Sequence, residues 1–168
     1  MNEIREADLT RDLQAIRSLW LDYLTWGNDE MEARHGFRLP VQETVERDLA
    51  NIAKFQPPSG RILLAFVENV PVGIACMQRI GPTTAEVKRM YVHPASRREG
   101  LGRAMLERLI EVARADCYRS LRLDSPDFMT AAHALYRSSG FVDIEAYPES
   151  EIPDEYKGYW VFMEKILG

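Results

Sequence analysis

A short loop of arginine and glycine residues has the composition of an anion-binding site. It runs Arg97-Arg98-Glu99-Gly100-Leu101-Gly102 and precedes a predicted helix. The first backbone N–H groups of a helix have no acceptor within the helix, and the helix dipole adds positive charge at the same end. Glycines let a phosphate approach this backbone closely, so the loop predicts a phosphate site; a solvated basic surface is the alternative.

The charge around this loop is opposite to that of the whole chain. Residues 88–103 hold five basic side chains and one acid, whereas the chain has a net charge of −5. Nucleic acids and anionic membranes bind mainly through their phosphates, so the overall charge disfavours both. ATP and NAD are also poor candidates, because Gly102 is not followed by Lys-Ser/Thr and Met105 replaces the third glycine of a dinucleotide fingerprint. No pair of histidines has metal-ligand spacing, so we predict no metal.

Hydrophobic periodicity predicts the elements that must hold the loop. Helices are expected over 13–24, 40–52, 101–113 and 130–139, with a break at 27–39 and a left-handed cap at Gly140. Strands are expected over 3–6, 61–68, 72–80, 85–92, 120–123, 142–146 and 159–165. The fold class is therefore α/β (α+β), with a mixed, mostly antiparallel twisted sheet, one parallel pair and flanking helices.

The chain length favours one domain. The 168 residues, 46% of them hydrophobic, can bury one good core and are too few for two ordinary domains, so residues 1–168 are assigned to one. There is no apolar run of membrane-spanning length and no signal-peptide pattern at the N-terminus, which predicts a cytoplasmic protein.

Three motifs in order resemble the core of the GNAT acyltransferases. They are Glu86-Val87-Lys88-Arg89-Met90-Tyr91-Val92-His93-Pro94, then Arg97-x-x-Gly100-x-Gly102, then Leu135-Tyr136-x-x-x-Gly140-Phe141. The glycine loop alone is a weak signal, but the three together are specific. The resemblance covers roughly residues 3–167. It implies the acyl-CoA N-acyltransferase fold, acetyl-CoA as cosubstrate and an amine as acceptor.

The resemblance also implies which residues bind the cofactor. The strand carrying Met90 and Val92 would splay from its parallel neighbour and bind the pantetheine arm through its backbone, while the glycine loop would bind the pyrophosphate. The cofactor-binding residues expected on this basis are Met90, Tyr91, Val92, Arg97, Arg98, Gly100, Leu101, Gly102, Arg103, Ala104, Ser125, Ala132 and Tyr136. Met129 departs from the family pattern, because many members have an asparagine there; Ser125 is the expected replacement.

Two side chains are the catalytic candidates. Tyr136 would donate a proton to the departing thiolate, since a tyrosine hydroxyl stays protonated at neutral pH. Glu86 would act as the base through water, because a primary amine with a pKa near 10.4 is only about one part in 2,500 neutral at pH 7. The alternatives are a packing role for Tyr136 and a surface ion pair with Lys88 or Arg89 for Glu86.

The acceptor is less well defined. A small-molecule or protein amine is expected, and six acids between Asp143 and Lys157 favour a cationic one unless they form an ordinary solvated loop. Trp20, Tyr23 and Trp26 could line the acceptor pocket or belong to the core. Met129 keeps a second hypothesis open, a catalytically idle acyl-CoA sensor. A homodimer is also left open.

Overall fold

The computed structural model describes all 168 residues and contains one seven-stranded sheet. The strands are β1 (Asn2–Glu6), β2 (Arg61–Val67), β3 (Val70–Arg79), β4 (Thr84–Val92), β5 (Ser120–Pro126), β6 (Val142–Ile144) and β7 (Trp160–Ile166). Their order across the sheet is β1-β2-β3-β4-β5-β7-β6. Only β4 and β5 are parallel neighbours, which confirms the predicted mixed sheet with one parallel pair.

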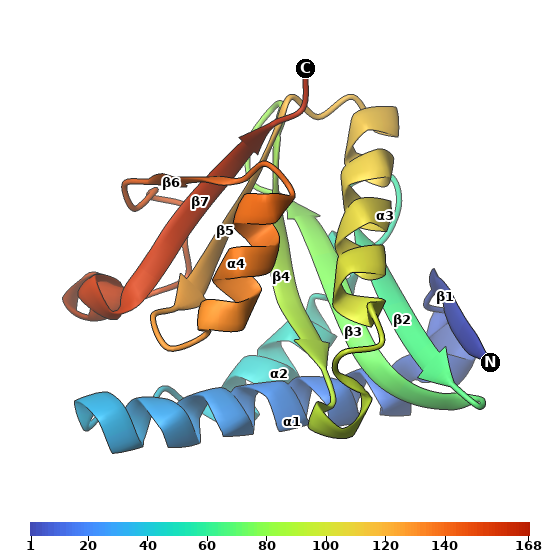
Figure 1. Ribbon diagram of the computed structural model, residues 1–168, viewed down its shortest axis with the longest axis horizontal. Helices are drawn as coiled ribbons and strands as arrows, with labels where there is room; N and C mark the ends of the chain where they lie inside the picture. Colours follow the sequence, from blue (N-terminus) through green and yellow to red (C-terminus); the bar gives the residue numbers. More distant parts are fainter.

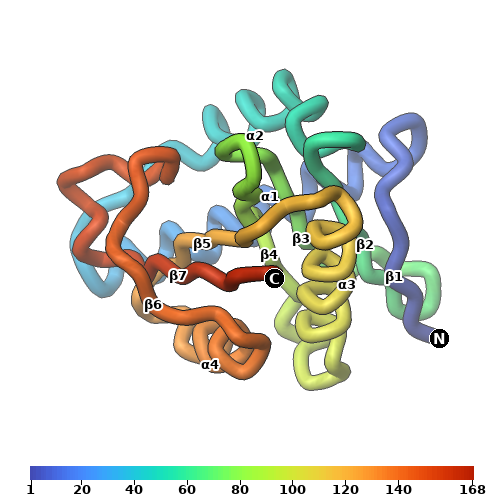
Figure 2. The backbone as a smooth tube through the Cα atoms, turned by 90° about the horizontal axis from the view of Figure 1, so that it is seen from above, coloured from blue at the N-terminus to red at the C-terminus, as the bar shows by residue number.

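Helices cover both faces of the sheet. The helices are α1 (Leu9–His35), α2 (Val41–Ala50), α3 (Leu101–Ala115) and α4 (Thr130–Ser138), with short 3₁₀ segments η1 (Ile52–Phe55), η2 (Pro94–Ser96) and η3 (Asp154–Tyr159). Seen from above, α1 and α2 lie on one side of the strands and α3 and α4 on the other (Figure 2). The molecule is therefore a three-layer α/β/α arrangement.

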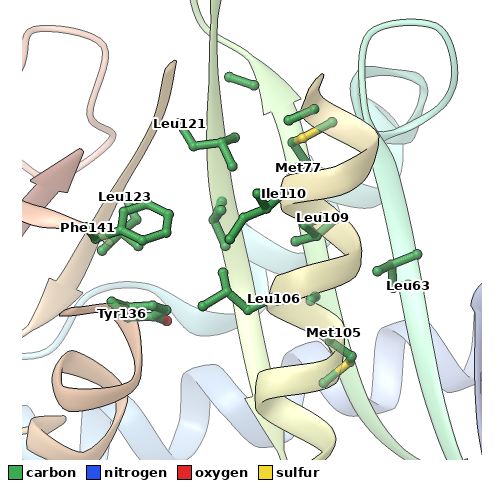
Figure 3. Packing of buried hydrophobic residues seen from close by; sticks show 14 of the residues in the cluster. Leu63, Met77, Met105, Leu106, Leu109, Ile110, Leu121, Leu123, Tyr136 and Phe141 are labelled. Carbon is green, nitrogen blue, oxygen red and sulfur yellow. The ribbon is translucent and has the colours of Figure 1, made fainter. Parts of the chain in front are cut away.

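The two faces of the sheet bury separate cores. Leu63 on β2 packs in the cluster under α3, which includes Met105 and Leu109 (Figure 3). Its neighbour Leu64 packs in the cluster under α1 with Trp20. Because successive side chains of a strand point to opposite faces, a strand buried on both sides needs the continuous apolar run that β2 has.

The parallel pair separates after three residues on each strand. Thr84, Ala85 and Glu86 of β4 pair with Ser120, Leu121 and Arg122 of β5. Beyond Glu86 no strand lies beside β4 on this side, while β5 remains paired with β7 (Figure 1). The sheet therefore opens between the ends of β4 and β5.

A bulge bends β4 in this open region. Ile74 and Cys76 of β3 face Tyr91 and Lys88 of β4, so β4 holds one extra residue between these pairs. Arg89 lies in that stretch with a φ of 53°. A bulge of this kind bends the strand and redirects its side chains.

The first helix is longer than the sequence pattern indicated. The predicted break at 27–39 begins too early, because α1 continues through Gly27 to His35 and is capped by Gly36, whose φ is 77°. A glycine inside a helix costs only about 1 kcal/mol, and Asn28 does not break the helix because its amide donates to the Leu24 carbonyl at 2.9 Å. No helix, α1 included, is both long and apolar enough to span a membrane.

Candidate active site

A cavity of about 540 Å³ lies at the open end of the sheet, between β4, the start of α3 and α4. It contains eleven of the predicted cofactor residues: Met90, Tyr91, Val92, Arg97, Arg98, Gly100, Leu101, Gly102, Arg103, Ala132 and Tyr136. Trp26, Phe128 and Met129 also line it and were not among the predicted cofactor residues. Ala104 and Ser125 do not line it.

The loop before α3 has the backbone of an anion cradle. Arg98 and Gly100 both have a φ of 77°, in the left-handed region. The amide of Ala104 donates to the Gly100 carbonyl at 3.0 Å, so the helical ladder begins there and Ala104 has no free donor. The amides before it, at Leu101, Gly102 and Arg103, are the unpaired donors of the helix start. A phosphate group fits this cradle.

Gly102 faces the inside of this cavity. A Cβ placed on it would lie 3.6 Å from the Leu135 side chain and 3.7 Å from that of Met90, in ordinary contact. A methyl group is therefore tolerated, whereas a longer side chain would project into the cavity or displace these neighbours. The residues present thus fit a bound pyrophosphate that needs a bare backbone at this point.

The arginines of the loop surround the cavity in different ways. Arg97 donates through Nε to the Val92 carbonyl at 2.9 Å, and its guanidinium carbon lies 4.9 Å from the centre of the Trp26 ring. The Val92 carbonyl, expected to face the pantetheine arm, therefore accepts one hydrogen bond from within the protein and keeps a second lone pair. Arg103 donates to the Ser138 hydroxyl at 3.1 Å.

Tyr136 brings an unused hydroxyl to the cavity. Its ring packs near Phe141, with the ring centres 5.9 Å apart, and extends from α4 toward β4 with the hydroxyl leading (Figure 3). The hydroxyl has no hydrogen-bond partner within the protein. Burial raises the pKa of Tyr136 well above its usual value, and the negative charge of Asp124 adds to this shift. The Tyr136 hydroxyl therefore stays protonated at physiological pH.

Ser125 does not replace the family asparagine in this cavity. Its hydroxyl is buried, lies 3.0 Å from His133 Nε2 and donates to Met129 Sδ at 3.8 Å. Burial lowers the pKa of His133, which keeps the imidazole neutral. Ser125 contacts both His133 and the Met129 sulfur, and of these three residues only Met129 lines the cavity.

A second cavity of about 230 Å³ lies on the other side of Met129, between α1, α2, the end of β5 and the segment before η3. Its apolar wall comprises Leu24, Met31, Leu39, Pro40, Val41, Pro126, Met129, Ile152, Pro153 and Trp160. Tyr23 lines it as well, so two of the predicted aromatic residues divide between the cavities, Trp26 in the first and Tyr23 in the second. Its charged groups are Arg47, Arg89, Asp124 and Glu151.

Most of these charges neutralise one another. Arg89, buried in the β4 bulge, donates to Asp48 at 2.8 Å and to Glu151 at 2.6 Å, and Lys88 Nζ lies 2.7 Å from Glu151. Burial alone would raise the pKa of Glu151, but Lys88 and Arg89 lower it well below its ordinary value. These pairs attach the segment before η3 to α2 and β4.

Several carboxylates of the acidic segment, residues 143–157, are therefore already paired with basic side chains. Besides Glu151, Asp143 pairs with Arg137 at 2.9 Å and Asp154 with Lys157 at 2.8 Å. Ion pairs of this kind reduce the potential that would attract a cationic substrate. The structure of this segment therefore supports a cationic acceptor less strongly than its sequence composition does.

Glu86 lies on β4 and lines neither cavity. It is completely buried, accepts hydrogen bonds from Tyr147 at 2.6 Å and Gln78 at 3.0 Å, and lies 3.7 Å from Lys88 Nζ. Burial raises the pKa of Glu86, while Lys88 opposes the shift. The alternative role, an ion pair with Lys88, is present but buried rather than at the surface. A direct contact with substrate would require Glu86 or its neighbours to move.

Asp124 is the carboxylate that sequence reasoning missed. It is half-buried on β5, lines the second cavity and accepts a hydrogen bond from the Ser150 hydroxyl at 2.9 Å. No basic side chain lies within ion-pair distance of it, in contrast to Glu151. The sequence held a signal, since Asp124 continues the polar alternation of Ser120 and Arg122 along the strand, but the predicted strand ended at Leu123.

Comparison with known proteins supports the resemblance seen in the motifs. The family model described as "Acetyltransferase (GNAT) family" matches residues 13–141. An uncharacterized N-acetyltransferase of Schizosaccharomyces pombe is 32% identical over 90% of this chain and 89% of its own length. The IAA acetyltransferase of Azospirillum brasilense is 35% identical over 83% and 87%. The fold matches that of PaiA N-acetyltransferase from Thermoplasma acidophilum in complex with coenzyme A, with a TM-score of 0.75, 17% identity and 99% of each chain covered.

The sheet topology and the structural match show the acyl-CoA N-acyltransferase fold, as the motifs predicted. The chain belongs to the GNAT family of acetyltransferases, and its enzyme class is that of the acetyl-CoA-dependent N-acetyltransferases.

Proposed function

We propose that this protein transfers an acetyl group from acetyl-CoA to a small primary amine by direct attack, with both substrates bound at once. The observation that carries the proposal is the meeting of two cavities at Met129, with the free hydroxyl of Tyr136 in one and the unpaired carboxylate of Asp124 in the other. Acetyl-CoA supplies the thioester, and its pyrophosphate is assigned to the backbone before α3. A cytoplasmic location remains a prediction.

The two side chains suit the two proton transfers of the reaction. The amine nitrogen forms a bond to the acetyl carbon as the carbon–sulfur bond breaks, so the amine must lose protons and the sulfur must gain one. Asp124 can hold the ammonium and accept its proton, and Tyr136 can protonate the sulfur. No covalent intermediate with the protein is required.

The second cavity favours an acceptor with an apolar body. Its wall is largely aliphatic, and the charges of Arg89 and Glu151 are already paired, so Asp124 is the one acid there without an ionic partner. Arg47 is more exposed and has only a 3.5 Å contact with Glu151. An amine whose hydrocarbon body fills the cavity matches this lining, and an acidic group on that body could reach Arg47.

The function can be tested by free thiol release from acetyl-CoA against a panel of amines. Aliphatic and aromatic monoamines, the corresponding amino acids, polyamines and lysine peptides should be compared by kcat/KM. We expect compact amines with an apolar body to be the best acceptors. Exclusive use of lysine peptides would overturn the small-molecule assignment, and saturable acetyl-CoA binding without transfer to any amine would favour the idle sensor.

Gly102→Glu tests the cofactor assignment. The substitution places a side chain and a negative charge where the pyrophosphate is expected, next to the unpaired amides of α3. We expect the affinity for acetyl-CoA, measured by calorimetry, to fall at least about tenfold. Gly102→Ala is the matched control and should lose much less, because its Cβ makes only ordinary contacts. Unchanged affinity in Gly102→Glu would place the cofactor elsewhere.

A further inference from the structure

Met129 forms the wall between the two cavities. It is the only residue that lines both, and its side chain is nearly buried, with 9% exposed. Its methyl end reaches α1, since a Cβ placed on Gly27 would lie 3.9 Å from Met129 Cε. The side chain thus extends from the start of α4 to α1 across the space between the cavities.

The surrounding contacts hold this wall in place. The Ser125 hydroxyl donates a hydrogen bond to Met129 Sδ at 3.8 Å. Trp26 precedes Gly27 in the sequence, and Phe128 precedes Met129. The two aromatic rings pack edge to face with ring centres 5.5 Å apart and line the cofactor cavity beside Met129. An alanine at position 27 would make only ordinary contact with the methionine, whereas a longer side chain there could enter the space that the Met129 methyl group occupies.

We propose that Met129 determines the length of the acyl group that the enzyme accepts. This rests on the proposed function, which requires the acyl carbon to lie where the cavities meet. A two-carbon acyl group ends before the methionine, whereas a longer chain must pass it to reach the apolar space of the second cavity. The methionine thereby also keeps that cavity free for the amine.

The test compares the affinities of acetyl-CoA and hexanoyl-CoA, measured by calorimetry in wild type and Met129→Ala without any acceptor. Each buried methylene group contributes about 0.8 kcal/mol, or about fourfold in affinity. If two of the added methylene groups enter the second cavity, Met129→Ala should bind hexanoyl-CoA about fifteenfold more tightly than wild type. Its affinity for acetyl-CoA should change by less than about threefold.

Met31→Ala is the matched control, because Met31 lines only the second cavity and loses the same atoms. Its ratio of hexanoyl-CoA to acetyl-CoA affinity should equal that of wild type. Met129→Val serves if Met129→Ala unfolds, and should shift the ratio in the same direction by a smaller factor. An unchanged ratio in the folded Met129 variants, or an equal shift in Met31→Ala, would overturn the proposal.

The binding readout separates this proposal from the proposed function. Absence of acetyl-CoA binding in wild type would contradict the cofactor assignment itself. Normal acetyl-CoA binding with no effect of Met129 on the chain-length ratio would contradict only the role of the wall.

Discussion

Tyr136→Phe is expected to lower kcat by a factor of about 100 to 10,000, the usual contribution of general acid catalysis. The phenylalanine keeps the ring contacts with Phe141 and removes only the hydroxyl, which has no partner within the protein. Folding and acetyl-CoA affinity should therefore match wild type. Single-turnover kinetics with a saturating amine would measure the chemical step without interference from product release.

The leaving group provides an independent check on the role of Tyr136. A more acidic thiol needs less protonation as it leaves. With an aryl thioester analogue of acetyl-CoA, the ratio of wild-type kcat to Tyr136→Phe kcat should therefore be smaller. An equal ratio for both thioesters would indicate a positioning role for Tyr136. A kcat within a factor of two of wild type would remove Tyr136 from the mechanism.

The pH dependence of this step follows from the direction of the Tyr136 shift. Burial raises the pKa, so the protonated donor persists from neutral pH well into the alkaline range. Loss of wild-type activity between pH 7 and pH 9 should therefore not be attributed to ionisation of Tyr136.

The sequence predicted the fold well where packing follows a simple period. The apolar run of β2 and the helical pattern of α3 correspond to strands and helices buried as expected. The end of α1 was missed because Gly27 and the charged residues after it indicate a break, whereas packing against the rest of the molecule maintains the helix. Local propensities of about 1 kcal/mol are small beside such tertiary contacts.

The sequence also grouped eleven residues that the structure places around one cavity. The loop from Arg97 to Gly102 could be grouped in this way because its residues are consecutive, and glycine positions in a sequence report backbone requirements directly. Its binding of the cofactor stays a prediction. The acceptor side could not be predicted in the same way. Asp124 lies on β5, Arg47 on α2 and Glu151 in the segment before η3, and only the fold shows that Asp124 has no ion-pair partner.

Asp124→Asn is expected to reduce kcat/KM by about 100-fold to 10,000-fold at pH 7. The activity of this variant should recover as the pH rises. Asparagine keeps the shape and can still bond the Ser150 hydroxyl, but it neither balances an ammonium charge nor accepts its proton. The neutral fraction of a primary amine with a pKa near 10.4 increases about tenfold per pH unit below that pKa. The ratio of wild-type to variant activity should therefore decrease from pH 7 to pH 9.

Glu86→Gln is the matched comparison, since it makes the same chemical change in a buried carboxylate that lines neither cavity. If Asp124 is the residue that contacts the amine, Glu86→Gln should lower activity by a similar factor at every pH, through the hydrogen bonds of Glu86 with Tyr147 and Gln78. Recovery at high pH in Glu86→Gln, with a uniform loss in Asp124→Asn, would assign the base to Glu86 acting through water and leave Asp124 a positioning role. Because the amide variants remain close to the native shape, circular dichroism and acetyl-CoA affinity should be equal in both, so the pH profiles decide between the two carboxylates.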